Sequence, residues 1–145
     1  MADAYPLLWT PSAERIANSR LTHFTRWLAQ HNQLHFTDYQ QLWDWSVNDL
    51  ENFWQSIWDY FDIRSSQPYH EILSTHAMPG AQWFTGSRLN FAEQLFRFNL
   101  SDDSADKPAI EAESETRAPL TLSWRELRSR VTSVANTLRA LGVGP

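Results

Sequence analysis

Residues 43–63 read WDWSVNDLENFWQSIWDYFDI and decide how the first half of the chain folds. The stretch carries four of the eight tryptophans, and apolar residues recur at helical spacing at positions 47, 50, 53, 57 and 61. This spacing predicts one helix with a continuous apolar stripe, opened by a cap-like pair at Ser46 and Asp49. Trp54 and Trp58 widen the stripe beyond what a surface helix needs. Each buried aromatic removes roughly 150–250 Å² from water, so we expect this face to dock against a large surface.

Two further helices are predicted upstream of this stretch. The first begins at Thr10, which is expected to cap it, with Pro11 in the first helical position. Apolar residues three or four positions apart continue it to His31. The second begins at Thr37, which can form a capping box with Gln40.

Turn-forming residues interrupt the pattern between residues 64 and 88, although large aromatic residues are embedded there. We expect this segment to be an irregular strap lying flat on a partner surface. Asn90 and Glu93 then predict the start of a short helix. The small, acidic residues 101–106 are typical of a linker and mark the expected domain boundary.

The sequence pattern changes from helical to strand-like after residue 106. Residues 108–113 and 120–124 are predicted strands of a hairpin, joined by a turn at 114–119. Ser123 and Glu126 form a capping box for a long amphipathic helix, which Gly142 is expected to end. Its apolar stripe predicts exposed apolar surface. A hairpin with one helix is rarely stable alone, so we expect the natural protein to continue after residue 145. The alternative is a complete small α+β protein.

Composition restricts the function. The 145 residues carry a formal net charge of −5, which argues against nucleic acid as the main partner. Cysteine is absent, which excludes disulfides, thiolate metal sites and thiol nucleophiles. No apolar run approaches the roughly 20 residues of a membrane helix, and the N-terminus lacks the pattern of a secretory signal. We therefore expect a cytoplasmic protein that binds neither membrane nor nucleic acid.

The histidines and the acidic residues could in principle supply ligands or catalytic groups, but neither set contains the further residues that a site requires. His31 and His35 stand four apart, as helical zinc ligands do, but no third ligand is near. His70 and His76 are isolated. The acidic residues of the tryptophan-rich stretch (44, 49, 51, 59 and 62) are expected to be solvated charges on its polar face.

Gly80 and Gly86, with Ser87 and Arg88 after them, suggest a phosphate cradle. A phosphate loop packs its glycines between a strand and a helix, and that context is missing here. We therefore predict no catalytic, cofactor-binding or metal-binding residue in the chain.

Three segments together resemble a known family. They are LWDWSVNDLENFWQSIWDYFDI (42–63), MPGAQWFTGSRLNFAEQLF (78–96) and LTLSWRELRSRVTSVANTLRALGVGP (120–145). They resemble the N-terminal part of acetoacetyl-CoA synthetases, which are adenylate-forming acyl-CoA ligases. The combination of W-S-V-x-D-L-E-x-F-W with L-N-F-A-E-Q-L-F favours the acetoacetate branch. In acetyl-CoA synthetases a second glycine would more usually stand where Ser87 follows Gly86.

The resemblance implies an α+β fragment of a larger enzyme. Residues 1–100 would be a mainly helical N-terminal extension, and residues 101–145 the start of a large α/β AMP-binding domain. That enzyme would convert acetoacetate, Mg-ATP and CoA to acetoacetyl-CoA through an acyl-adenylate. The motifs that hold ATP, Mg²⁺ and CoA would lie outside this chain, whose own partner would be the remainder of the large domain. Other interpretations are an acetyl- or propionyl-CoA synthetase and a stand-alone helical interaction module.

Overall fold

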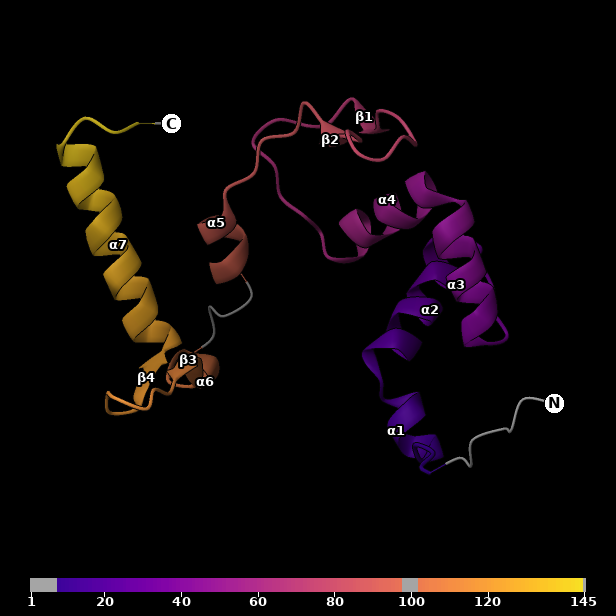
Figure 1. The fold of residues 1–145 in the computed structure, drawn as a ribbon, viewed down its shortest axis with the longest axis horizontal. Helices are drawn as coiled ribbons and strands as arrows, with labels where there is room; N and C mark the ends of the chain where they lie inside the picture. The colour runs from indigo at the N-terminus through magenta and orange to yellow at the C-terminus, as the bar shows by residue number, and fades with distance from the viewer. Residues whose placement is uncertain (1–7, 98–101, 145) are drawn as a thin grey trace. The chain divides into compact units, whose positions relative to one another are not determined.

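The computed structural model describes residues 8–97 and 102–144, and the chain divides into two units, residues 1–89 and 90–145. The first unit combines helices with one short strand pair (Figure 1). Its described elements are α1 (Ala13–Ala17), α2 (Arg20–His31), α3 (Tyr39–Asn48), α4 (Leu50–Tyr60), β1 (Glu71–Leu73) and β2 (Trp83–Thr85).

The first predicted helix is interrupted, so that part of the prediction was wrong. Ser12, and not Thr10, caps α1, and Pro11 lies before the cap. A second cap at Ser19 opens α2, where the Ser19 hydroxyl accepts a hydrogen bond from the Thr22 amide at 3.1 Å. The Thr22 hydroxyl donates to the Ile16 carbonyl at 2.6 Å. These side chains compete with the backbone and break the helix. The predicted end at His31 is confirmed.

The cap of the second predicted helix lies one residue later than expected. Asp38 caps α3 and accepts a hydrogen bond from the Gln41 amide at 2.9 Å, so the predicted Thr37–Gln40 box was wrong. Asp and Ser are better caps than Thr, which explains why the neighbouring residue takes the role.

The tryptophan-rich stretch forms parts of two helices, not one. Residues up to Asn48 belong to α3, and α4 begins after Asp49, whose φ of −126° and ψ of 64° are not helical. The Asp49 carboxylate accepts the indole N–H of Trp45 at 3.2 Å and thereby holds the break. Ser46 is not a cap, because its hydroxyl donates to the Trp43 carbonyl inside α3. The single stripe predicted from position 47 to position 61 is therefore divided.

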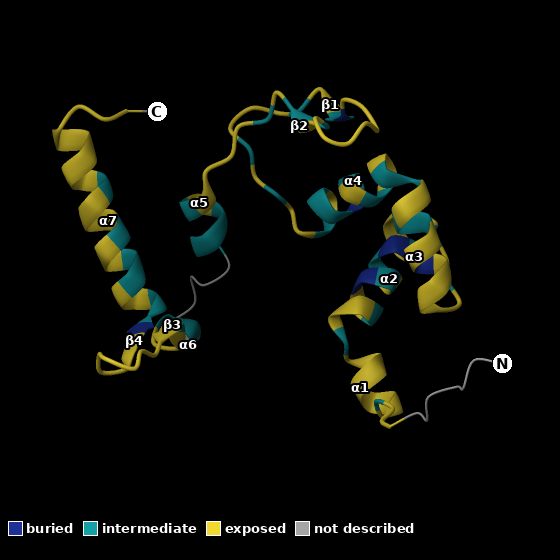
Figure 2. Ribbon diagram, viewed as in Figure 1, coloured by how far each residue is buried: buried dark blue, intermediate teal, exposed yellow. Residues whose placement is uncertain are grey.

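The core of the first unit lies where α2, α3 and α4 meet (Figure 2). Phe24, Leu28 and Leu42 are buried, and Leu28 has no exposed surface. Ser56 of α4 is also buried, but its hydroxyl donates to the Phe53 carbonyl at 2.6 Å. Its polar group is thus satisfied, as buried polar groups must be.

The segment predicted to be irregular contains the antiparallel pair β1–β2. Glu71 faces Thr85 and Leu73 faces Trp83 across this ladder. The pair contacts α4, so the strap lies on a helix of its own chain. Three residues per strand are too few for an alternating pattern to stand out in the sequence.

The second unit follows the prediction more closely. Its described elements are α5 (Phe91–Phe96), α6 (Asp102–Ala105), β3 (Pro108–Ala112), β4 (Leu120–Ser123) and α7 (Trp124–Ala140). The Asn90 cap of α5 is confirmed, as is the antiparallel β3–β4 hairpin. The expected linker contains the short helix α6; Ser101 lies outside the described residues. The expected domain boundary between residues 100 and 101 stays a prediction.

Helix α7 begins and ends where its local signals predict. The capping box of Ser123 and Glu126 is present in both directions. Trp124 is the first helical residue and not the last of the strand, a one-residue correction. Gly142, with a φ of 85°, ends the helix, and the Val143 amide donates to the Leu138 carbonyl at 3.0 Å. This is a Schellman motif. The expected α+β organisation, mainly helical with short antiparallel strand pairs, is confirmed.

Candidate functional site

Two apolar hollows open on the described surface, one in each unit. The first, which we call the aromatic cleft, has a volume of about 240 Å³ and is lined by Trp54, Trp83 and Phe84. The Trp54 and Trp83 rings meet edge to face, with centroids 5.6 Å apart and planes at 62°. Their residues are 40% and 41% exposed, so the indoles form walls of the cleft and remain accessible to a ligand.

The backbone at Phe84 builds this cleft. Successive side chains of a regular strand point to opposite faces, yet Trp83 contacts Trp54 and Phe84 contacts Trp58, both on α4. Phe84 has a φ of 49°, in the left-handed region that a bulky residue rarely adopts. This backbone lets two consecutive aromatic side chains reach the same helix. Tyr69 packs edge to face against both Trp58 and Phe84, which supports the inner wall.

Acidic and basic groups lie beside the cleft. Glu51 is three residues before Trp54 on α4, and residues at this spacing are neighbours on a helix surface. The Glu51 carboxylate lies 3.8 Å from the imidazole of His76, and both side chains are more than half exposed. This separation is longer than a hydrogen bond.

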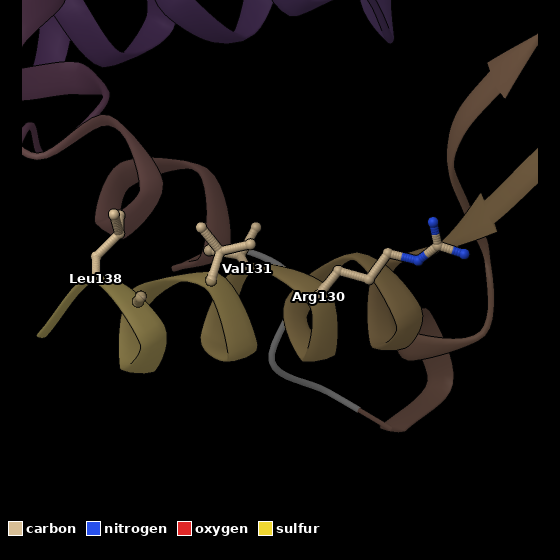
Figure 3. Close-up of a pocket in the computed structure, with 5 residues that line it drawn as sticks. Arg130, Val131 and Leu138 are labelled. Carbon is tan, nitrogen blue, oxygen red and sulfur yellow. The ribbon is translucent and has the colours of Figure 1, made fainter. Parts of the chain in front are cut away.

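The second hollow, the α7 groove, has a volume of about 330 Å³ and an almost wholly apolar lining. Val131 and Leu138 project from the same side of α7 (Figure 3). Val134 is 60% exposed, and Leu138 is also exposed. This confirms the predicted exposure of the apolar stripe on the last helix. The groove holds no polar group suited to chemistry beyond Arg130 at its border.

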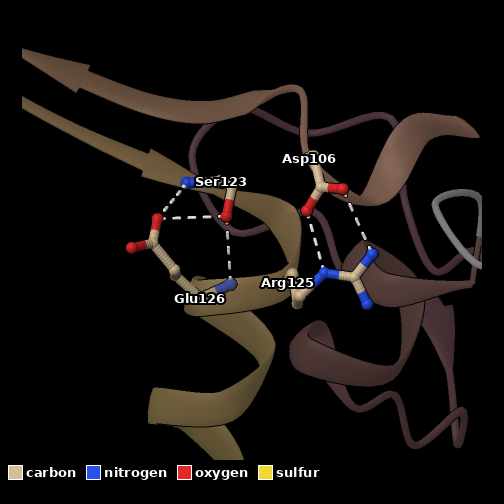
Figure 4. Close-up of polar contacts among 4 residues, drawn as sticks. All are labelled: Asp106, Ser123, Arg125 and Glu126. Atoms are coloured by element: carbon tan, nitrogen blue, oxygen red, sulfur yellow. Dashed lines mark hydrogen bonds and ion pairs between the residues drawn. The ribbon is translucent and has the colours of Figure 1, made fainter. Parts of the chain in front are cut away.

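A polar cluster holds the start of α7 (Figure 4). Arg125 donates to both carboxylate oxygens of Asp106, at 2.8 and 3.3 Å. The hydrogen bonds from the Arg125 side chain, followed by its charge, lower the pKa of Asp106 below its ordinary value of 3.8. Hydrogen bonds from the Ser123 backbone and side chain lower the pKa of Glu126 below 4.5. Both carboxylates accept hydrogen bonds within this unit, and neither lines one of the two hollows.

The histidines do not form a site. His31 stacks on Trp27 with centroids 4.6 Å apart, and its Nδ1 lies 3.0 Å from the Trp27 carbonyl. His35 is exposed, and His70 lies beside Thr85. Within residues 8–97 and 102–144, no group of three or more metal-ligating side chains is placed to hold an ion.

The glycine-containing turn does not fit a phosphate. Gly86 has a φ of 88°, as a tight turn requires. The amide of Ser87 donates to the Phe84 carbonyl at 3.1 Å, and that of Arg88 donates to the Gln67 carbonyl at 3.3 Å. Both amides already donate hydrogen bonds to backbone carbonyls, so they are not available to bind an anion. The expectation that ATP and Mg²⁺ bind outside this chain stays a prediction.

The acidic residues of the tryptophan-rich stretch are separated by the break at Asp49. The Asp44 carboxylate accepts a hydrogen bond from the side-chain amide of Gln40 at 3.0 Å. The Asp49 carboxylate accepts hydrogen bonds from the indole N–H of Trp45 and the side-chain amide of Asn52. Glu51 lies beside the aromatic cleft, which the sequence did not reveal. The sequence shows that Trp83 and Phe84 lie in the turn-rich segment, but no sequence signal predicts the positive φ of Phe84.

In the part of the chain that the structure describes, no helix has both the length and the apolar character needed to cross a bilayer.

Comparison with known proteins gives one consistent result. Residues 39–95 match the family model described as acetyl-coenzyme A synthetase N-terminus. The acetoacetyl-coenzyme A synthetase of Rhizobium meliloti (strain 1021) is 31% identical over 137 residues, and the acetoacetyl-CoA synthetase of Gallus gallus is 32% identical over 139. Each match covers 94% of this chain and 20% of the relative.

A solved structure extends the match to the fold. The acetoacetyl-CoA synthetase from Streptomyces lividans aligns with a TM-score of 0.78 and 43% identity. The alignment covers 94% of this chain and 21% of that structure. The chain thus spans about a fifth of the length of these relatives. Residues 39–95 therefore match the acetyl-coenzyme A synthetase N-terminus model, and nearly the whole chain is similar to the N-terminal part of acetoacetyl-CoA synthetases.

Proposed function

We propose that this chain is the N-terminal part of an acetoacetate–CoA ligase. The complete enzyme would join acetoacetate to ATP, release diphosphate to give an acyl-adenylate, and transfer the acyl group to CoA with loss of AMP. The observation that carries the proposal is the 43% identity with a solved acetoacetyl-CoA synthetase over 94% of the chain. A cytoplasmic location is part of the same proposal.

Within that enzyme, these residues have a structural role. Residues 1–100 would be the helical extension, and residues 101–145 would begin the AMP-binding domain. The exposed groove formed by Val131, Val134 and Leu138 supports this role, because apolar surface of this kind marks a contact with another protein surface. The remainder of the large domain would cover it. ATP, Mg²⁺ and CoA would bind to residues outside this chain.

The test uses the protein encoded by the complete gene. Purified enzyme should release diphosphate in the presence of Mg-ATP and acetoacetate, and form acetoacetyl-CoA when CoA is added. The 145-residue chain is the matched control, which should form no product and give no heat of tight binding with Mg-ATP. Equal activity with acetate or propionate would overturn the acetoacetate assignment. Tight Mg-ATP binding by the chain alone would overturn the structural role.

One observation favours a second candidate substrate. A protein from Penicillium aethiopicum, 31% identical over 142 residues, is a malonamoyl-CoA synthetase. Proteins similar to this chain therefore include synthetases named for more than one acid substrate. Malonamate belongs in the same substrate comparison, alongside acetate and propionate. A gene product that lacks ligase activity with all four acids would instead favour a stand-alone interaction module.

A further inference from the structure

We propose that the aromatic cleft of Trp54, Trp83 and Phe84, together with Glu51, binds the guanidinium group of an arginine presented by another polypeptide segment. This inference concerns the surface of the first unit and does not depend on the ligase assignment. It begins from the lining of the cleft, whose volume of about 240 Å³ is bordered by three aromatic residues, Trp54, Trp83 and Phe84.

The ring geometry suits a cation. The faces of indole rings carry negative electrostatic potential, and tryptophan is the strongest aromatic partner for a cation. The planes of Trp54 and Trp83 meet at 62°, so the two walls approach a right angle. Both residues are about 40% exposed, which leaves ring surface available at the mouth of the cleft.

The charge beside the cleft is complementary. Glu51 lies one helical turn before Trp54, a spacing at which two residues are neighbours on a helix surface. The neighbouring His76 imidazole stands 3.8 Å from that carboxylate, beyond hydrogen-bond distance, so an incoming cation can compete with it. The chain carries a net charge of −5, which adds a long-range attraction for basic segments.

The pairing of a flat ring with a carboxylate favours arginine over lysine. A guanidinium group is planar, stacks on aromatic faces and presents a fork of N–H donors to a carboxylate. A lysine ammonium is a compact and strongly hydrated charge that cannot stack. The left-handed backbone of Phe84 supports a role for the cleft, because such strain persists where the surroundings impose it and is common at binding sites.

The experiment is a titration of the isotope-labelled 145-residue chain followed by the indole N–H resonances in NMR spectra. The probe is the blocked peptide acetyl-Gly-Arg-Gly-amide, and its neutral control replaces arginine with citrulline, which has the same shape without the charge. Single Trp→Phe variants at positions 54 and 83 assign the two resonances. We expect saturable shifts at both indoles, with binding roughly fivefold tighter for arginine than for citrulline.

Glu51→Gln tests the carboxylate without removing an aromatic wall. Because Glu51 is exposed, the fold should persist, and the dissociation constant for the arginine peptide should rise roughly threefold. Glu111→Gln, an exposed strand position in the other unit, makes the same change in charge and should leave binding as in the unmodified chain.

Several results would overturn the proposal. They are the absence of saturable shifts, equal binding of the citrulline peptide, and an unchanged dissociation constant in Glu51→Gln. A lysine peptide that binds as tightly as the arginine peptide would contradict the guanidinium assignment. If tetramethylammonium chloride bound more tightly than the arginine peptide, the cleft would be a site for a free quaternary ammonium ligand and the arginine proposal would be wrong.

Discussion

The turn after β2 shows how single residues shape this protein. Phe84 and Gly86 both have positive φ, 49° and 88°. Gly86 has no side chain, and a Cβ at this position would overlap the ring of His70. Phe84 bears the conformational cost that glycine avoids, about 1–2 kcal/mol, in order to place its ring against α4. The geometry of the cleft is therefore set by backbone conformation at two positions.

Gly86→Ala should destabilise the first unit. The new methyl group meets His70 and the residue is held at a positive φ, so we expect a loss of about 1–3 kcal/mol in the free energy of unfolding. Urea unfolding followed by tryptophan fluorescence measures it. Gly80→Ala is the matched control, because Gly80 has a φ of 115° but nothing within 4 Å of its Cβ position. Equal losses in the two variants would contradict the steric part of the argument.

The polar cluster predicts that the second unit loses stability in acid. Asp106 and Glu126 have pKa values lowered below 3.8 and 4.5 in the folded chain. The folded state therefore binds fewer protons than the unfolded state in this range, and stability falls as pH decreases. The contribution of each carboxylate is full above its unfolded pKa and is lost as the pH falls through its lowered folded pKa.

Thermal melts of helix ellipticity between pH 7 and pH 3 would measure this loss. Asp106→Asn and Glu126→Gln each remove one titrating group, so each should flatten the decrease. A double variant with the same acid sensitivity as the unmodified chain would show that other groups cause it.

At the level of elements, side chains within a few residues of one another cap the helices and also lie at their breaks. Two of the predicted starts moved to an adjacent or nearby residue, Ser12 and Asp38, that caps better than the predicted threonine. At the break between α3 and α4, the Asp49 carboxylate accepts a hydrogen bond from the Trp45 indole N–H. Breaking the helix there lets α3 and α4 change direction and contribute separately to the core.

Leu28→Ala tests the packing of these helices. Leu28 is fully buried between α2 and its neighbours, so its truncation should lower the free energy of unfolding by about 2–5 kcal/mol. Leu21→Ala, an exposed position on the same helix, is the control and should cost less than about 1 kcal/mol. Chemical denaturation measures both. A similar loss in the two variants would contradict the position of the core.

On the scale of the whole molecule, the second unit leaves more apolar surface exposed than a self-sufficient domain needs. The groove on α7 is lined by valine, alanine and leucine, and Leu141 near its end is also exposed. Exposed apolar patches mark contacts with other surfaces or favour self-association. The chain by itself should therefore bind hydrophobic dyes and associate at high concentration.

Replacing Val134 and Leu138 together with glutamine should weaken this behaviour. We expect lower dye fluorescence and less self-association, with helix ellipticity unchanged because glutamine favours helices. Ser129→Gln with Thr132→Gln, at exposed polar positions of α7, is the matched control and should leave dye binding as before. A flat dye response in the unmodified chain would contradict the prediction.

Much of the second unit was predictable because its signals are local. The Ser123–Glu126 box, the Asn90 cap and the Gly142 stop each depend on residues within five positions of one another. The prediction failed in the strap, where β1 and β2 are three residues long and pair across a span of 14 residues, as Glu71 and Thr85 do. Of the candidate binding cleft, only the presence of the aromatic residues was visible.

The helical and hairpin segments and the resemblance to acyl-CoA ligases can be predicted from the sequence alone, because capping, periodicity and motif spacing are local properties of the chain. The contacts of Trp83 and Phe84 with α4 and the pairing of β1 with β2 are visible only in the folded chain. Those features depend on contacts between segments distant in sequence. Their free energy is set by which surfaces meet, and the residues on one segment cannot specify that alone.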